Sequence, residues 1–336
     1  METSVEGRRT ISLIVSDAVT DSPAPVGPPR VAVVAFAITV LLGGANAVAV
    51  KQTVQELAPL WGAGLRFAAA GLLMVAIVLA TSRKFGRGKT LTGAVLYGLL
   101  GFAASYGLLY TGIQHVPAGT VMVLVALTPL FTFGLALLHR QERFRIQGLL
   151  GALIALAGVA IVFIDQVLAD VPVGSMLLIL LGTVAIAESG VVAKSIPESD
   201  PFATNAVAML TGAVVLFILA LVAREPLAVP ATVATWLATG YLVVLGSVVM
   251  FALFLFTLQR WTASAVSYVT LLMPLVTVVL AAIAFEERIS PSFVIGSAVV
   301  LVGVYIGAFF TRQPRHVPAS SLPECLPVEH RTTAVR

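Results

Sequence analysis

The sequence predicts an all-α polytopic membrane protein with ten transmembrane helices, arranged as a 5+5 inverted-topology repeat. Three observations predict this fold class: the composition, the length of the apolar segments and an internal duplication. Of the 336 residues, 59% are hydrophobic and 11% are charged, whereas a soluble domain carries about 25% charged residues. A water-soluble fold of this size would have too few charges to cover its surface. The composition therefore excludes an ordinary cytosolic enzyme, a disordered chain and a nucleic-acid binder.

Ten apolar segments follow a polar, proline-rich stretch, residues 1–30, that we expect to be a disordered cytoplasmic tail. Each segment is long enough to cross a hydrocarbon core of about 30 Å as a helix of about 20 residues. Barrel strands are excluded because these segments are too long and too continuously apolar. The predicted spans are 31–50, 57–81, 91–113, 117–139, 146–165, 172–193, 201–223, 232–258, 263–285 and 292–311. A second polar tail, 312–336, follows them and is also predicted to be cytoplasmic.

The basic residues divide unequally between the two sides of this predicted topology. With the N-terminus inside, 16 of the 20 Lys and Arg residues fall in the inner loops and the tails. Three fall in outer loops, at Lys51, Arg224 and Arg288, and the remaining one, Arg66, lies within a span. Because cytoplasmic loops are enriched in Lys and Arg, we expect a multi-pass protein of the plasma (inner) membrane with both termini cytoplasmic. The net charge of +4 then needs no nucleic-acid partner.

An internal duplication relates the two halves. A shift of 145 residues aligns Ala118–Ile161 with Ala263–Ile306 without gaps, and 15 of these 44 positions are identical. The identical pairs include Pro129/Pro274, Glu142/Glu287, Arg143/Arg288, Gly151/Gly296 and Gly158/Gly303. Chance similarity between apolar stretches would match Leu and Val rather than these residue types. A unit of five spans is odd, so the second copy, 172–311, enters the membrane from the side opposite to the first, 31–165. Such inverted repeats are common in secondary transporters.

Several short motifs occur in a fixed order along the chain. The pattern G-x-N-x-x-x-x-K at Gly44–Lys51 is followed by Pro59-x-Trp61 and Arg66-Phe67, and then by P-L-x-T with a downstream Glu-Arg, which is duplicated. This order resembles the EamA-type transporters of the drug/metabolite transporter superfamily, over about residues 31–311. The resemblance implies ten helices in two inverted copies, both termini in the cytoplasm, a central cavity, and export of small metabolites or amino acids.

Two charged residues lie inside predicted spans, where burying a charge is costly. At 1.5 Å per residue, Glu188 lies about 9 Å from the inner end of the sixth span and Arg66 about 13 Å below the outer surface. Glu188 is either a proton-coupling or cation-binding carboxylate, or a structural acid. Arg66 either holds a substrate carboxylate or binds helix-end carbonyl groups. Their depths differ by roughly 8 Å in a core of about 30 Å, so we expect no direct salt bridge between them.

Polar and aromatic side chains in other spans are candidates for lining a cavity. Tyr106, Tyr110 and Gln114 recur every four residues and therefore share one helix face. The counterpart of Gln114 in the second copy is Gln259. Tyr110 also fits the membrane interface, where tyrosine is enriched. Asn46 lies inside the first span, and its amide is predicted either to line the cavity or to bond a neighbouring helix.

The paired prolines Pro129 and Pro274 are predicted to be bending points for gating, with a fixed kink as the alternative. Tyr268 lies near the second proline and is expected to face the cavity. Glu142 and Glu287, at helix ends beside arginines, are predicted to anchor loops. Four glycines are predicted to permit close helix packing: Gly151, Gly158, Gly296 and Gly303.

These features predict a secondary active transporter, not an enzyme, that exports a small amino acid-like or drug-like solute by alternating access. Its expected partners are the lipid bilayer, the small-molecule substrate and protons; no prediction of oligomeric state follows. An importer or exchanger of similar solutes is the alternative. An intramembrane enzyme is less favoured because no His–carboxylate pair is predicted within the membrane. With one cysteine, Cys325, and four scattered histidines, no metal site and no cofactor are expected.

Overall fold

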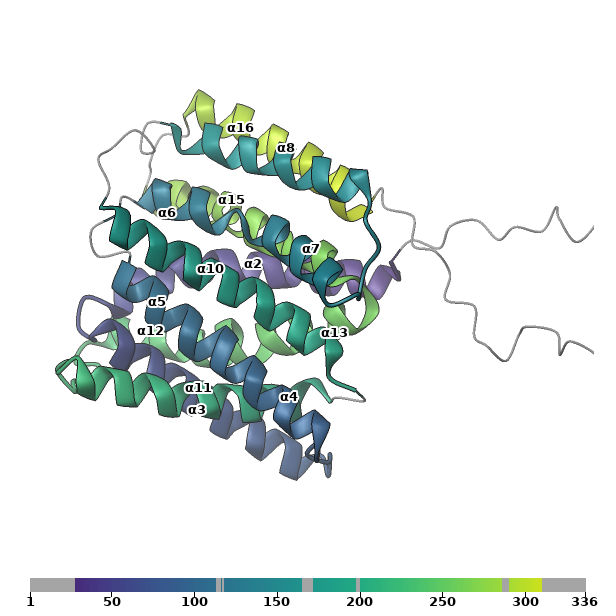
Figure 1. Ribbon diagram of the computed structural model, residues 1–336. Helices are drawn as coiled ribbons and strands as arrows, with labels where there is room; N and C mark the ends of the chain where they lie inside the picture. Colours follow the sequence, from purple (N-terminus) through teal and green to yellow (C-terminus); the bar gives the residue numbers. More distant parts are fainter. Residues whose placement is uncertain are drawn as a thin grey trace, which may run out of the picture. The chain divides into compact units, whose positions relative to one another are not determined.

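The computed structural model describes residues 28–112, 116, 118–164, 172–197, 200–285 and 290–309. All regular structure in these ranges is helical, and no strand occurs among them (Figure 1). The first copy comprises α2 (Arg30–Thr53), α3 (Pro59–Ala80), α4 (Lys89–Gly98), η1 (Leu99–Ala104), α5 (Ser105–Gly112), α6 (Ala118–Val125), α7 (Thr128–Leu138) and α8 (Ile146–Val162). The second comprises α10 (Val173–Ser195), α11 (Pro201–Val222), α12 (Val233–Val243), η3 (Val244–Val249), α13 (Met250–Arg260), α14 (Ala263–Ser267), α15 (Val269–Phe285), α16 (Pro291–Val304) and η4 (Tyr305–Phe309).

These elements form the helical segments that the sequence predicts. Within the described ranges, nine segments are long and apolar enough to cross a membrane, and α8 is a shorter apolar helix of 17 residues. At 1.5 Å per residue α8 is about 26 Å long, close to the hydrocarbon thickness of about 30 Å. The predicted fold class, an all-α protein with many membrane spans, is confirmed. The two predicted tails lie outside the described residues, apart from Pro28 to Arg30.

Many large apolar side chains are exposed on the outside of the helix assembly, and many alanines are buried inside it. Leu79 is 66% exposed and Ile283 is 73% exposed, whereas Ala70, Ala206 and Ala220 are fully buried. Lipid tails are as apolar as leucine, so helices in a bilayer associate through close packing and hydrogen bonds rather than through a hydrophobic driving force. This distribution of side chains is the one expected for a protein whose solvent is lipid.

The helix contacts repeat between the two copies. Helix α3 packs along α11, and α8 packs along α16, so both pairs join equivalent helices of the two copies (Figure 1). Helix α2 packs against α15 and α13 of the second copy, and its counterpart α10 packs against α7 and α5 of the first. Exchanging the two copies therefore leaves this set of contacts unchanged, and the core is built from both halves together.

Two π-helices occupy equivalent places in the copies. The segments η1 and η3 interrupt the third and eighth spans and begin and end 145 residues apart, the same shift that aligns the later spans. In a π-helix the backbone bonds run from residue i to i+5, and such wide turns are frequent at functional sites. Both π-helices face the region where the copies meet, since η1 contacts α10 and η3 contacts α2.

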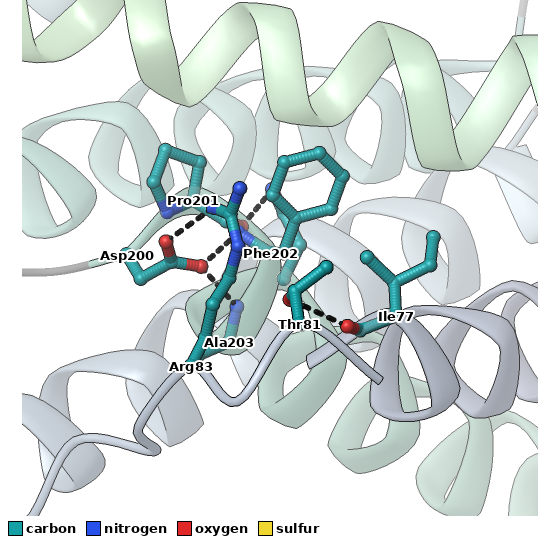
Figure 2. Close-up of polar contacts among 8 residues, drawn as sticks. Ile77, Thr81, Arg83, Asp200, Pro201, Phe202 and Ala203 are labelled. Carbon is teal, nitrogen blue, oxygen red and sulfur yellow. Dashed lines mark hydrogen bonds and ion pairs between the residues drawn. The ribbon is translucent and has the colours of Figure 1, made fainter. Parts of the chain in front are cut away.

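Charged side chains fasten both ends of the α3–α11 pair. At the first end, Asp200 is the N-cap of α11 and accepts hydrogen bonds from the backbone N–H groups of Phe202 and Ala203. The guanidinium of Arg83, which follows α3, binds Asp200 with an Nη1–Oδ2 distance of 2.6 Å and lies over the ring of Phe202 (Figure 2). The contact therefore joins the end of α3 to the start of α11.

At the opposite end of the α3–α11 pair, a glutamate rather than an arginine joins the two helices. Glu225, which follows α11, accepts hydrogen bonds from the backbone N–H groups of Leu60 and Trp61 at 3.2 and 2.8 Å. Both N–H groups lie in the first turn of α3, where the helix dipole favours negative charge. Arg83 and Glu225 each follow a residue with positive φ, at Ser82 and Arg224. Equivalent turns of the two copies therefore carry opposite charges.

Glycines bring α8 and α16 into backbone contact, as the sequence predicts. A Cβ added to Gly158 would lie 2.6 Å from the backbone nitrogen of Val300, and one added to Gly303 would lie 2.4 Å from that of Ala155. Real Cβ contacts this short do not occur, so only glycine fits at these points. The small-residue face is the means by which the fifth and tenth spans pack.

The paired prolines lie in different local structures. In the first copy the helix is interrupted at residues 126–127, and Pro129 follows in the first turn of α7. In the second copy the interruption falls at Tyr268, and Pro274 lies inside α15. Equivalent prolines thus do not produce equivalent breaks. The gating role of both residues stays a prediction.

Candidate functional site

A cavity of about 350 Å³ lies between the two copies. Its walls come from α2, α3, the η1 region and α5 of the first copy, and from α10, α13 and α15 of the second. Sites for small molecules usually have volumes of about 300–1,000 Å³ and apolar walls with a few polar groups. The polar side chains of this cavity are those of Thr39, Asn46, Arg66, Tyr97, Ser105, Tyr106, Tyr110, Ser189 and Thr270.

Aromatic rings form one wall of the cavity. Tyr106 and Tyr110, predicted to share a helix face, both line it, and their rings meet edge to face with centroids 5.6 Å apart. The ring of Phe67 packs against Tyr106 from behind at 4.8 Å. Phe251, the repeat counterpart of Tyr106, lines the cavity from the second copy. Gln114, the third member of the predicted stripe, lies outside the described residues.

Arg66 reaches from α3 to the π-helix η3 of the other copy. Its side chain is 4% exposed and lines the cavity. The guanidinium donates from Nε to the hydroxyl of Ser247 at 2.8 Å and from Nη2 to the carbonyl oxygen of Gly246 at 2.7 Å. A carbonyl group within a π-helix is thus the acceptor for a buried cation. Arg66 and Glu188 form no ion pair, as expected from their predicted depths.

Asn46 binds the same carbonyl oxygen. Its Nδ2 donates to Gly246 O at 3.1 Å and contacts the sulfur of Met250 at 3.4 Å, while Oδ1 is buried without a hydrogen-bond partner among the described residues. The predicted alternatives for Asn46 therefore both occur, because the residue lines the cavity and also joins two helices.

The first copy has an equivalent but simpler contact. Helices α2 and α10 begin 143 residues apart, so Ser189 of α10 corresponds to Asn46 of α2. Ser189 lies against Gly101 of η1, the counterpart of Gly246; a Cβ added to Gly101 would lie 3.1 Å from the serine Oγ. The cavity therefore has two matched contacts between a first-span residue of one copy and a π-helix of the other.

Glu188 lies outside the cavity wall, although its neighbour Ser189 lines it. Its Oε1 is 3.0 Å from Nε2 of His139, and its Oε2 is buried without a hydrogen-bond partner in the described structure. The sequence predicted no His–carboxylate pair within the membrane and did not predict this contact, which the structure forms through a histidine at a helix end. His139 follows the last residue of α7, and its side chain is 40% exposed. The pair therefore lies at the ends of the spans, where a histidine meets water.

Further polar contacts join helix ends next to this pair. Glu142, predicted to anchor a loop, accepts hydrogen bonds from the backbone N–H and the hydroxyl of Ser264 in the first turn of α14. Lys194 donates to the carbonyl oxygens of Leu258 and Trp261, where α13 ends. Glu287, the counterpart of Glu142, lies outside the described residues. These bonds tie the loop after α7 and the end of α10 to the junction of α13 and α14.

The other predicted site residues lie elsewhere. Tyr268, expected to face the cavity, is 2% exposed, does not line it and donates to the carbonyl oxygen of Gly148 in α8 at 3.2 Å. Its ring fits beside Gly307, where a Cβ would collide with the tyrosine hydroxyl. Gln259 is exposed in the last turn of α13 and is not part of the cavity lining.

Three polar groups that line or support the cavity were missed. Ser247 binds Arg66, Ser105 donates to the carbonyl oxygen of Gly101, and the Tyr97 hydroxyl is buried without a hydrogen-bond partner in the described ranges. The sequence contained no clear signal for them, because Ser105 and Tyr97 lie one and nine positions before Tyr106 and so fall off the helix face that Tyr106 and Tyr110 share.

The helices and the cavity together define a class of protein. Two similar five-helix copies that meet at a mainly apolar cavity with a few polar groups are the architecture of a secondary transporter. The chain belongs to the EamA-like transporter family, whose pattern matches residues 30–164 and 174–308. The resemblance to EamA-type transporters is thereby confirmed, and the protein is a multi-pass membrane protein of a transporter family.

Several of its relatives are named as transporters. YedA, an uncharacterized inner membrane transporter of Escherichia coli (strain K12), is 30% identical over 73% of this chain and 79% of its own length. An uncharacterized transporter of Archaeoglobus fulgidus is 26% identical over 81% of this chain and 97% of its own. A chloroplastic WAT1-related protein of Arabidopsis thaliana, At3g02690, is 24% identical over 79% and 66%. One crystal structure shares the fold with a TM-score of 0.73 at 19% identity, covering 84% of this chain and 100% of the other.

Proposed function

We propose that this protein is a secondary active transporter that exports a small metabolite across the plasma membrane by alternating access. The observation that carries the proposal is the matched pair of contacts at the cavity, Asn46 with Gly246 and Ser189 with Gly101. Each contact joins the first helix of one copy to a π-helix of the other. Because the two copies make equivalent contacts at one cavity, each copy can adopt the conformation of the other. Such an exchange of conformations opens the cavity first to one side of the membrane and then to the other.

The hydrogen bonds of Glu142 and Lys194 close one end of the transporter. They connect helix ends of both copies, and their members are hydrogen bonds rather than packed apolar groups. Each such bond to a charged group contributes about 1.5–3 kcal/mol net, which a conformational cycle can exchange for bonds to water when this end opens. With both termini in the cytoplasm, as the distribution of basic residues favours, this end faces the cytoplasm.

The pair of Glu188 and His139 supplies a site for a coupling proton. The free, buried oxygen of Glu188 has no partner in the described part of the chain. Protonation there removes a charge from a wall that is adjacent to the cavity through Ser189. A proton gradient then drives the conformational change, because the two protonation states favour different packing of α10 against α7.

The first experiment identifies a transported solute and then tests the coupling. Purified protein is screened by thermal unfolding against amino acids, nucleosides and drugs, because a bound solute raises apparent stability. A stabilising solute is then loaded into proteoliposomes, and its export is measured against an imposed pH gradient. Glu188→Gln is expected to abolish the dependence on the gradient in a folded protein. Glu56→Gln, which changes an acid in the loop after α2, is the matched control and should keep it.

Two results would contradict the proposal. Full dependence on the pH gradient in Glu188→Gln removes this residue from the coupling mechanism. Solute movement that does not saturate with substrate concentration, and that is no faster than in liposomes without the protein, removes the transport function altogether.

A further inference from the structure

The buried guanidinium of Arg66 has no acidic partner in the described part of the chain. Only two ion pairs occur there, Arg83 with Asp200 and His139 with Glu188. An arginine side chain stays charged in proteins, and an isolated buried charge is costly unless it is paired. The two acceptors of Arg66, a serine hydroxyl and a backbone carbonyl, are both neutral. Its charge is therefore left without a counter-ion.

Most of the hydrogen-bonding capacity of this guanidinium is also unused. The group has five N–H donors in a planar fork, and two of them are bonded to described residues, from Nε and Nη2. Because Arg66 lines the cavity, the unused donors are available to a molecule inside it. The planar fork matches the two oxygens of a carboxylate, and such paired contacts are strong and directional.

Two more unsatisfied polar atoms belong to residues of the same cavity. Asn46 Oδ1 and the Tyr97 hydroxyl are buried without partners in the described structure, and Tyr97 is 2% exposed. Asn46 and Arg66 donate to the same carbonyl oxygen, so their bonding nitrogens lie within about 6 Å of each other. A buried polar group without a partner is rare in a native protein and calls for an explanation. A ligand in the cavity whose oxygen accepts from the Tyr97 hydroxyl supplies one for that group.

The rest of the wall favours an apolar body and offers no opposing charge. Arg66 is the only charged side chain among the described residues that line the cavity, and Glu188 is engaged with His139 instead. The rings of Tyr106, Phe251 and Phe254 face the same space. The cavity thus has one cationic, donor-rich end and an aromatic remainder.

Only one copy carries the cation. Helices α3 and α11 both have 22 residues and begin with proline, so the eighth residue of each, Arg66 and Ala208, are equivalent. Ala208 is fully buried and packs against the backbone at Gly98. The cavity therefore breaks the symmetry of the repeat at this point and provides for a single anionic group.

We propose that this cavity binds an organic monoanion, with its carboxylate on Arg66 and its apolar or aromatic body against the tyrosine and phenylalanine rings. The inference rests on the proposed function only in treating the occupant as the transported solute. Binding itself is measurable in the purified protein, without any transport.

The test compares three molecules of one shape and different charge: 3-phenylpropanoate, 3-phenylpropanamide and 3-phenylpropylamine. In wild-type protein in detergent, the carboxylate should raise the unfolding temperature, and the amide and the amine should not. Arg66→Gln should weaken the carboxylate by about tenfold to a hundredfold, the range expected for lost hydrogen bonds between charged groups. Arg66→Lys should retain part of the binding. Arg260→Gln changes an exposed arginine outside the cavity and is the matched control, which should bind normally.

A second variant guards against the possibility that Arg66→Gln does not fold. Asn46→Asp places a carboxylate near Arg66, so the protein carries its own counter-ion and should lose affinity for the carboxylate probe while remaining folded. Equal stabilisation of wild type by the amide and the carboxylate overturns the proposal, as does unchanged carboxylate binding in Arg66→Gln or Asn46→Asp.

The outcomes separate this proposal from the transport function. Export of a neutral or cationic solute by protein that binds no carboxylate refutes the anion site and leaves transport standing. Carboxylate binding that depends on Arg66, in protein that moves no solute, supports the site and refutes the transporter.

Discussion

Replacing Gly303 by alanine should force α8 and α16 apart. The added Cβ would lie 2.4 Å from the backbone nitrogen and 2.7 Å from the Cβ of Ala155, and 2.7 Å from the carbonyl oxygen of Gly151. Non-bonded atoms prefer about 3.5–4.0 Å, so the backbones must separate by about 1 Å. A gap of that size removes a quarter to a half of the attraction at each neighbouring contact.

The magnitude follows from two opposing effects. Overpacking a close contact costs about 1–3 kcal/mol, and the cost falls near the upper end because backbone atoms cannot rotate away. Alanine recovers about 1 kcal/mol through its better helix propensity. The net loss is about 2 kcal/mol, which lowers the unfolding temperature by roughly 3 °C for a chain of 336 residues with the unfolding entropy per residue of soluble domains.

Gly134→Ala is the matched control for this substitution. Gly134 also lies within a helix, but nothing lies within 4 Å of an added Cβ. It should be unchanged or stabilised by up to about 1 kcal/mol. Both variants are compared with wild type by thermal unfolding in the same detergent. If Gly303→Ala unfolds at the same temperature as Gly134→Ala or above it, close approach of the two helices does not limit the packing, and the reasoning fails.

Hydrogen bonds lower the pKa of Glu56 from its usual 4.5 to about 2; the largest contribution comes from the Thr232 hydroxyl and the next from the backbone N–H of Ala231. The ionised acid therefore stabilises the fold above pH 4.5, and this stabilisation is lost as the pH falls towards 2. Acid unfolding of Glu56→Gln should lack that component, and an unaltered acid profile would contradict it. Pro274→Ala, tested with Pro129→Ala, should slow turnover more than it weakens binding; unchanged turnover in proteoliposomes would exclude a bending role. Single cysteines placed in residues 83–89 should react only with reagents that reach the cytoplasm, and labelling from outside would refute the proposed orientation.

The helices and the repeat could be predicted because they depend on properties that are local in sequence. Continuous apolar length marks a span wherever it packs, and pairs such as Gly158 and Gly303 keep their register without any knowledge of the fold. The same locality placed Tyr106 and Tyr110 together on one face. Arg66 and Asn46 were singled out as site candidates because a polar side chain inside a span has few other places to go, and both line the cavity.

Other features depended on which helices are neighbours, and the sequence contains little information about that. His139 lies 49 residues before Glu188 in the chain, so their pairing follows from the packing of α7 against α10 rather than from any spacing. Tyr268 turns towards α8 because Gly307 leaves room for its ring, a contact that joins distant segments. No particular residue types mark the π-helices in the sequence. They arise where the backbone hydrogen bonds change from an i to i+4 to an i to i+5 pattern.

The matched π-helices also bear on the history of the chain. A wide turn with one extra residue changes the rotation of everything after it by about 100°, because successive residues of a helix are offset by that angle. Two such turns that begin and end 145 residues apart are more simply inherited than acquired twice. The single five-helix ancestor therefore already contained the wide turn before its gene was duplicated. Arg66 in α3 and Ala208 at the equivalent position of α11 show that the two copies have since diverged beside these turns.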